Sequence, residues 1–239
     1  MRRQRPTKNK KKNPTNHKRI IRRIKIIQIQ KIQQPYIPQQ IQTIYHQYYQ
    51  EILLFENREK TQEIYNTIIL DSFIQFLIIQ KLLEKIEKNE IEVIDIGTGL
   101  GIPSIPIIIA IKQLKITNRL LRFHLLEPKQ KKIRFLEYIR SKFDLEFEIY
   151  NLDEKAFYSI NKKRFDIVLC RAVFPPPKIF DIFKKYSTNF SLWQYSQNYQ
   201  QILTKYQNKI NQNKLIVSHI FEYQLSSKLL YTVVFKKLI

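Results

Sequence analysis

The sequence contains very little glycine. Only three of its 239 residues are glycine, whereas average usage of about 7% would give roughly 17. All three lie within five consecutive positions, as Gly97, Gly99 and Gly101. Glycine allows positive φ angles and lets another group approach the backbone without a Cβ in the way. Because glycine is absent from the rest of the chain, its presence at these three positions indicates that side chains are not tolerated in this loop.

Cysteine and long apolar runs are scarce as well. The single cysteine, Cys170, excludes an internal disulfide and a zinc site made of thiolates. No run of about 20 apolar residues is present, so we expect no transmembrane helix and no membrane partner. The histidines show no metal-ligand spacing, so we expect no metal site. They are His17, His46, His124 and His219.

Acidic residues are missing from the start of the chain. Residues 1–50 contain no Asp or Glu and carry 13 basic residues, more than half of the net charge of +22. Such a charge favours a polyanionic partner. We predict a basic arm over residues 1–40, and we expect disorder in its first 19 residues, which lack apolar periodicity. The arm residues predicted to bind RNA are Arg2, Arg3, Arg5, Lys10, Lys11, Lys12, Arg19, Arg22 and Arg23.

This arm has three interpretations. It is a solvated charge run without a specific partner, an RNA-phosphate clamp whose binding weakens steeply with salt, or an organelle transit peptide. Residues 1–50 contain no Ser and no Ala, which argues against a transit peptide. We favour RNA contact and keep the other two open. For the compartment we expect a bacterial-type cytoplasm, with mitochondrion or plastid as the alternative.

Hydrophobic periodicity changes near residue 90. Over residues 41–90 apolar residues recur three and four positions apart, which predicts a helical N-terminal segment. Over residues 91–239 short apolar runs alternate with amphipathic stretches, which is typical of an α/β fold with a mainly parallel sheet covered on both faces. The last pair of strands is expected to include an antiparallel one. Strands are predicted at 91–96, 122–127, 145–150, 165–170, 189–193, 214–219 and 229–236, and helices at 103–112, 128–142, 176–186 and 196–210.

The glycine loop joins the first of these strands to the first crossover helix. In open α/β sheets ligands bind here, beyond the carboxyl ends of the strands. The spacing G-x-G-x-G differs from the G-x-G-x-x-G of dinucleotide folds, and the G-K-S/T of a phosphate-binding loop is missing. Asp95 precedes the loop, where a carboxylate suits the cationic amino acid end of S-adenosylmethionine. Glu127 ends the next strand, where a carboxylate can accept hydrogen bonds from both ribose hydroxyls. The alternative is a simple glycine turn with a capping Asp.

Several motifs resemble one family, the bacterial RsmG (GidB) methyltransferases. DIGTGLGIPSIP, residues 95–106, is similar to the family loop D-V/I-G-S/T-G-x-G-L/F-P-G-I-P. LLEPKQKKIRFLE resembles LLDSxxKRxxFL, and FDIVLCRAVFPPPKIFD resembles FDxVxSRAxAxLxxLxx. LDSF at 70–73 resembles the LDSL of the family's N-terminal helices. The likeness covers about residues 60–185 well and the tail weakly.

The resemblance implies a fold and an activity. The fold is the class I methyltransferase fold, a Rossmann-like three-layer sandwich with a mainly parallel seven-stranded sheet in residues 91–239. The activity is S-adenosylmethionine-dependent N7 methylation of a guanosine in small-subunit (16S-type) ribosomal RNA, with that RNA or the small subunit as partner and a monomeric enzyme. Two alternatives stay open: a catalytically weak or inactive homologue that binds rRNA during assembly, and a methyltransferase with another substrate.

The resemblance also implies roles for individual residues. The glycine loop and Ile102 would line the cofactor pocket, Glu127 would hold the ribose, and Asp153 with Glu154 falls near the adenine-binding pair. Arg171 matches an arginine at the edge between cofactor and substrate, where its role is positioning. The expected cofactor-binding residues are Asp95, Gly97, Gly99, Gly101, Ile102, Glu127, Asp153, Glu154 and Arg171.

The sequence departs from the family pattern at a few positions. Ser104 replaces the glycine of P-G-I-P, a change that can crowd the loop, and Ile68 stands where the family has His. FSLWQ at 190–194 stands where the family has a lysine-glycine pair, which removes an expected RNA or active-site contact. We expect Trp193 and Cys170 to pack in the core rather than to act chemically. These departures are the reason for keeping the inactive homologue as an alternative.

Overall fold

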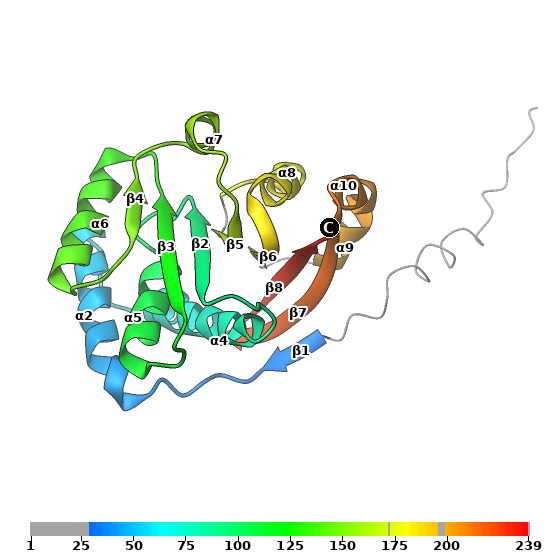
Figure 1. Cartoon of the computed structure of the whole chain (residues 1–239). Helices are drawn as coiled ribbons and strands as arrows, with labels where there is room; N and C mark the ends of the chain where they lie inside the picture. The colour runs from blue at the N-terminus through cyan, green and yellow to red at the C-terminus, as the bar shows by residue number, and fades with distance from the viewer. Residues whose placement is uncertain (1–28, 172, 196–198, 239) are drawn as a thin grey trace, which may run out of the picture.

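The computed structural model describes residues 29–171, 173–195 and 199–238 (Figure 1). Its centre is an eight-stranded sheet in the order β1-β7-β8-β6-β5-β2-β3-β4. β8 runs antiparallel to β6 and β7, and the other neighbours are parallel, which confirms the predicted α/β architecture. The strands are β1 Ile29–Ile32, β2 Glu90–Ile96, β3 Leu120–Leu126, β4 Glu148–Tyr150, β5 Phe165–Arg171, β6 Ser187–Tyr195, β7 Leu215–Leu225 and β8 Lys228–Lys237.

The sheet has one strand more than the seven predicted. β1 lies at the edge and pairs in parallel with β7, with Ile29 opposite Ile220. Its local sequence, IQKI, carries no signal strong enough to predict a strand, and the free edge of β7 supplies the hydrogen-bonding partners that fix it. The described fold thus already includes residues assigned to the basic arm. The residues predicted to bind RNA, from Arg2 to Arg23, lie outside the described residues.

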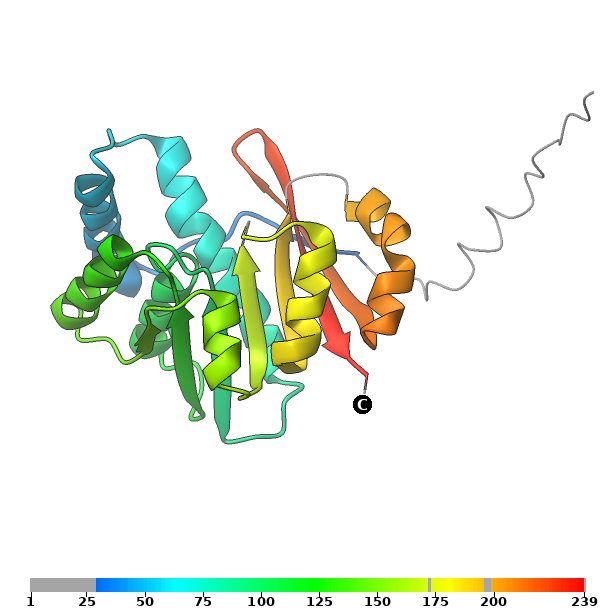
Figure 2. The ribbon, with the colours of Figure 1, turned by 90° about the horizontal axis from the view of Figure 1, so that it is seen from above.

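Helices cover both faces of the sheet (Figure 2), so the predicted three layers are present. The apolar side chains of α2, α4, α5 and α6 form one core with one face of the sheet. Those of α7, α8, α9 and α10 form a second core on the other face. The helices are α2 Gln39–Glu56, α3 Gln62–Tyr65, the π-helix η1 Asn66–Leu70, α4 Asp71–Leu83, α5 Ser104–Leu114, α6 Gln130–Lys142, α7 Glu154–Ile160, α8 Pro176–Tyr186, α9 Tyr199–Lys205 and α10 Gln207–Gln212.

Helix α2 is fixed directly to the glycine loop. Its buried residues recur at helical spacing and include two tyrosines that face the loop. The Tyr48 hydroxyl donates to the carbonyl of Leu100 at 2.7 Å, and the Tyr45 hydroxyl donates to the carbonyl of Pro106 at 2.7 Å. A buried hydroxyl needs such a partner. The N-terminal helix therefore holds the middle of the glycine loop, at Leu100, and the first turn of α5, at Pro106.

The helical stretch Gln62–Leu83, made of α3, η1 and α4, is long and apolar enough to cross a membrane by length and composition. In the fold, 72% of its most apolar window is buried inside the protein. Its side chains pack in the core that α2 and α5 share with the sheet. The hydrophobicity of this stretch is therefore explained by packing within the chain.

Candidate cofactor and substrate site

The glycine loop turns sharply between β2 and α5. The Gly97 N–H donates to the carbonyl of Leu126 at 2.8 Å, which ties the loop to the end of β3. The N–H groups of Gly101 and Ile102 both donate to the carbonyl of Thr98, at 3.0 and 3.2 Å. The loop is thus a fixed turn at the carboxyl edge of the parallel strands, where the sequence predicted a ligand site.

The three glycines are needed for different reasons. A Cβ on Gly97 would lie 2.6 Å from a methyl group of Val173, and a Cβ on Gly101 would lie 2.2 Å from Ile105. These two glycines therefore serve close packing within the protein. A Cβ on Gly99 would meet only the end of the Lys132 side chain, at 3.5 Å. Gly99 is the glycine whose bare side leaves space that the described protein does not fill.

Asp95 lies at the base of this loop and is almost completely buried. Its Oδ2 accepts hydrogen bonds from the hydroxyls of Thr98, at 2.8 Å, and Ser104, at 2.7 Å. Its Oδ1 is buried and has no hydrogen-bond partner among the described residues. Burial raises the pKa of Asp95 to about 6, although the two hydroxyl donors favour the ionised form. The sequence suggested that Ser104 can crowd the loop. In the structure its hydroxyl instead donates a hydrogen bond to the Asp95 carboxylate.

The carboxylate of Glu127 is hydrogen-bonded to the glycine loop at Gly99. Its Oε2 accepts from the Gly99 N–H at 3.0 Å and its Oε1 accepts from the Lys129 N–H at 2.9 Å. A carboxylate has about four acceptor positions, so each oxygen keeps one lone pair for a further donor. The structure therefore brings Glu127 and the glycine loop together, as the sequence predicted.

A cavity of about 260 Å³ opens beside the loop. Gly97, Asp153 and Glu154 line it together with the apolar side chains of Leu126 and Phe174. The Asp153 carboxylate caps α7 by accepting from the Ala156 N–H at 2.8 Å, and the Glu154 carboxylate pairs with Lys185 at 3.1 Å. Both acids therefore shape the wall while their carboxylates are engaged within the fold. Ile102 packs against the core and does not line this cavity.

Arg171 ends β5 and lines a second cavity, of about 350 Å³. Its Nη2 lies 3.4 Å from Oδ2 of Asp71 and donates to the carbonyl of Thr67 at 3.1 Å. Its Nη1 is buried and has no hydrogen-bond partner among the described residues. A buried guanidinium nitrogen without a partner is costly, so this group is available to an anion or a carbonyl of a ligand.

A buried polar network holds Arg171, and the sequence did not predict it. The Gln194 amide donates to both oxygens of Asp71 at 3.1 Å, and the Tyr223 hydroxyl donates to Oδ1 at 2.9 Å. Gln75 and Thr232 extend the network by bonds of 3.0 and 3.1 Å. Burial raises the pKa of Asp71, while Arg171 and these donors favour its charge. Asp71 lies in the LDSF motif, which was the available signal for it.

The other residues that depart from the family pattern have side chains buried in the core. Ile68 and Trp193 are buried, as is Cys170. Burial raises the pKa of the Cys170 thiol well above its usual range, so this thiol is not a nucleophile. In FSLWQ, the stretch that stands where the family has a lysine-glycine pair, the Gln194 amide donates to Asp71 and lines the Arg171 cavity.

Comparisons with known proteins agree with this geometry. A family model described as rRNA small subunit methyltransferase G matches residues 39–228. The ribosomal RNA small subunit methyltransferase G of Mesomycoplasma hyopneumoniae is 35% identical over 117 residues, 49% of this chain and 53% of that protein. Its counterpart in Ligilactobacillus salivarius is 30% identical over 112 residues, 45% of this chain and 44% of that protein. The chain thus spans about half the length of the curated relatives it matches.

A solved structure shows the same fold. The magnesium protoporphyrin IX methyltransferase of Synechocystis, with S-adenosylmethionine bound, matches with a TM-score of 0.56 at 11% identity, over 85% of this chain and 100% of that one. Identity this low supports the fold alone, which is the class I methyltransferase fold. Because the family model covers most of the sequence, including the glycine loop, Glu127 and Arg171, the chain belongs to the rRNA small subunit methyltransferase G (GidB) family.

Proposed function

We propose that this protein uses S-adenosylmethionine to methylate N7 of a guanosine in small-subunit ribosomal RNA. The observation that carries the proposal is the arrangement at the glycine loop: Gly99 has an open side, its N–H holds the Glu127 carboxylate, and one buried oxygen of Asp95 has no partner among the described residues. The family supports the same activity, and the fold is shared with a structure that binds S-adenosylmethionine. A glycine turn with only a structural role does not require a buried carboxylate oxygen without a partner.

The residues around the loop fit this cofactor. The free acceptor positions of Glu127 would take the two ribose hydroxyls, and the cavity between Leu126 and Phe174 would take the adenine ring. Asp95, with one unpaired oxygen, would attract the ammonium group of the amino acid end, directly or through water. When bound, S-adenosylmethionine supplies an electrophilic methyl group attached to a positively charged sulfur.

The chain's own contribution is positioning. N7 of guanine carries a free lone pair at neutral pH, so the protein does not have to remove a proton from it. The walls of the cleft have to align N7 with the methyl carbon and exclude water. The guanine becomes cationic on transfer, so a nearby guanidinium would oppose that charge. Arg171 therefore serves to hold an RNA phosphate or the carboxylate of the cofactor with its free Nη1.

The proposal is tested by two measurements on the full-length chain. S-adenosylmethionine at about 100 times its Kd should raise the free energy of unfolding by about 2.7 kcal/mol. Glu127→Ala should abolish this stabilisation, and Glu137→Ala, which removes an exposed carboxylate on α6, should retain it. Methyl transfer to small subunits and to free small-subunit RNA is then mapped by mass spectrometry. Absence of any methylated guanosine would contradict the proposal.

A second candidate is a weak or inactive homologue that binds rRNA during assembly. The observation in its favour is the stretch 190–194, which stands where the family has a lysine-glycine pair and whose Gln194 amide is bound to Asp71. The same measurements separate the two, because cofactor stabilisation without methyl transfer supports the second candidate. A monomeric state, a site of action away from membranes and a bacterial-type cytoplasmic location remain predictions.

A further inference from the structure

Helix α2 presents an uncharged polar face to solvent over its first half. Its apolar residues turn inward, and Gln39, Thr43 and Gln47 are exposed on the opposite side. Surface helices usually carry charged side chains on that side. The charged residues of α2 lie in its second half, at Glu51 and Glu56. The first half therefore offers hydrogen-bonding groups without charge.

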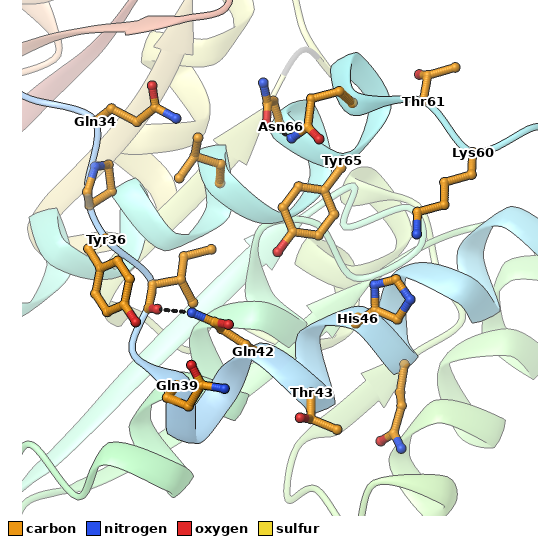
Figure 3. Close-up of a pocket in the computed structure, with 15 residues that line it drawn as sticks. Gln34, Tyr36, Gln39, Gln42, Thr43, His46, Lys60, Thr61, Tyr65 and Asn66 are labelled. Atoms are coloured by element: carbon orange, nitrogen blue, oxygen red, sulfur yellow. Dashed lines mark hydrogen bonds between the residues drawn. The ribbon is translucent and has the colours of Figure 1, made fainter.

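This face forms one wall of a groove of about 980 Å³ (Figure 3). The linker before α2, with Tyr36, and the segment from Lys60 to Tyr65 form the other walls, and His46 lines the groove from α2. The side chain of Tyr36 is 75% exposed. None of the described residues that line the groove is Asp or Glu. A phosphate backbone therefore meets no like charge on these walls.

The groove shares a wall residue with the cavity that contains Arg171. Asn66 lines the groove, the Arg171 cavity and a third cavity of about 540 Å³ beside β1. The three together are called the trough here. The acids of the two smaller cavities have basic partners. These pairs are Glu63 with Lys228, Glu222 with Lys31 and Asp71 with Arg171.

We propose that the trough binds the unpaired RNA strand that flanks the target nucleotide. This inference rests on the proposed function, because it takes Arg171 as a group that holds a phosphate of the RNA close to the target nucleotide. Amide and hydroxyl groups match the uncharged edges of unpaired bases, and an exposed tyrosine provides a surface on which a base stacks. The groove volume falls within the roughly 300–1,000 Å³ of sites that enclose drug-sized ligands, so a base and its sugar fit.

The position of the basic segment supports RNA over an uncharged partner. Twelve basic residues precede Ile29 in the sequence. The chain joins the sheet at β1, and Lys31 and Ile32 line the third cavity. Positive charge that attracts phosphates is therefore attached at one end of the trough.

Crosslinking tests where the RNA lies. Tyr36→p-benzoylphenylalanine is placed in the full-length protein, and the protein is irradiated with small subunits and with free small-subunit RNA. The trough predicts crosslinks to unpaired nucleotides next to the methylated guanosine. Crosslinks confined to duplex RNA or to a ribosomal protein, or no crosslinks, would overturn it.

Charge reversal tests the contribution of the groove to affinity. Gln39→Glu, Thr43→Glu and Gln47→Glu together should weaken binding to a single-stranded small-subunit RNA fragment by at least about tenfold. The matched control, Thr204→Glu, Asn208→Glu and Gln212→Glu, adds the same charge at exposed positions of α9 and α10. Both triple variants should keep the stabilisation by S-adenosylmethionine, which shows that they are folded. Equal RNA affinities for the two would overturn the inference.

Tyr36→Ala provides a milder test and separates the two proposals. Loss of one stacked base should weaken RNA binding by about tenfold, with cofactor stabilisation unchanged. If the wild type methylates a guanosine but Tyr36→Ala and the charge variants bind RNA normally, the trough is wrong and the proposed function stands. If the variants lose RNA affinity but the wild type methylates no guanosine, the proposed function is wrong, and the trough binds RNA without a target nucleotide beside it.

Discussion

Two buried carboxylates lie near the carboxyl edge of the sheet, and the structure uses them differently. Asp95, on β2, accepts two hydroxyl groups on one oxygen and has no partner for the other among the described residues. Asp71, at the start of α4, has hydrogen-bond donors on both oxygens and an ion pair with Arg171. Burial raises the pKa of both groups. In the proposed function the unsatisfied carboxylate belongs to the cofactor site, and the satisfied one fixes the structure around Arg171.

The largest effect is expected at the satisfied carboxylate. Asp71→Ala should lower the free energy of unfolding by about 4 kcal/mol, because it leaves the guanidinium of Arg171 and the donors of Gln194 and Tyr223 unpaired. Asp95→Ala should lower the free energy of unfolding by at most about half as much. The substitution also removes a buried charge that lacks a full set of partners, and this gain offsets part of the loss. Chemical denaturation measures both. An equal or larger loss for Asp95→Ala would break the comparison.

The next effect is a pH dependence from Asp95. Its pKa is raised from 3.8 to about 6 in the fold, so the protonated form is favoured there. Its contribution to stability is fully present below about pH 4 and is lost as the pH rises through 6. Two pKa units correspond to about 3 kcal/mol. Asp95→Asn should remove this loss, so that the variant without cofactor is more stable than the wild type at pH 8 by denaturant titration. Parallel pH profiles would contradict this assignment.

A pair of glycine substitutions sharpens the boundary between packing and ligand space. Gly101→Ala should destabilise the protein by about 2 kcal/mol, because its Cβ meets Ile105 and its φ is positive. Gly99→Ala should cost about 1 kcal/mol, from its positive φ alone, yet should weaken S-adenosylmethionine binding at least tenfold. Thermal unfolding and calorimetric titration provide the two readouts. If Gly99→Ala binds the cofactor normally, its open side is not the ligand space.

The smallest effect is expected at Ser104. Ser104→Gly restores the residue of the family loop and removes one hydrogen bond to Asp95, at a cost of about 1 kcal/mol. The pKa of Asp95 should rise further, because a donor to its charged form is lost. The pH profile of unfolding measures the shift. A profile unchanged from the wild type would show that Ser104 does not act on Asp95.

The region around Asp95 could be predicted from the sequence, and the region around Asp71 could not. Strands β2, β3 and β5 and the glycine loop carry local signals, in apolar runs and in the spacing of the glycines. In the Asp71 network, Asp71 is bonded to Gln194, which lies 123 positions away in the sequence, and to Tyr223, which lies 152 positions away. No periodicity reports such contacts. β1 was missed for the same reason, since its partner β7 lies at the other end of the sequence.

Helix boundaries show the same limit on a smaller scale. The single helix predicted over 196–210 is divided into α9 and α10, and Tyr206 lies between them with its φ outside the helical range. The predicted strand over 145–150 is shorter and begins at Glu148. In both cases packing against neighbouring elements, and not the local pattern, sets the ends of the element.

The most direct test of the cofactor site is the affinity for S-adenosylmethionine between pH 5 and pH 7, measured by calorimetry on wild type and Asp95→Asn. If the ionised carboxylate attracts the ammonium group, the wild-type affinity should rise about tenfold over this range, because the ionised fraction of Asp95 rises about tenfold through its pKa of about 6. The affinity of Asp95→Asn should be weaker and should not depend on pH. A flat wild-type profile, or the same slope in the variant, would contradict the assignment of Asp95 and the glycine loop to the cofactor.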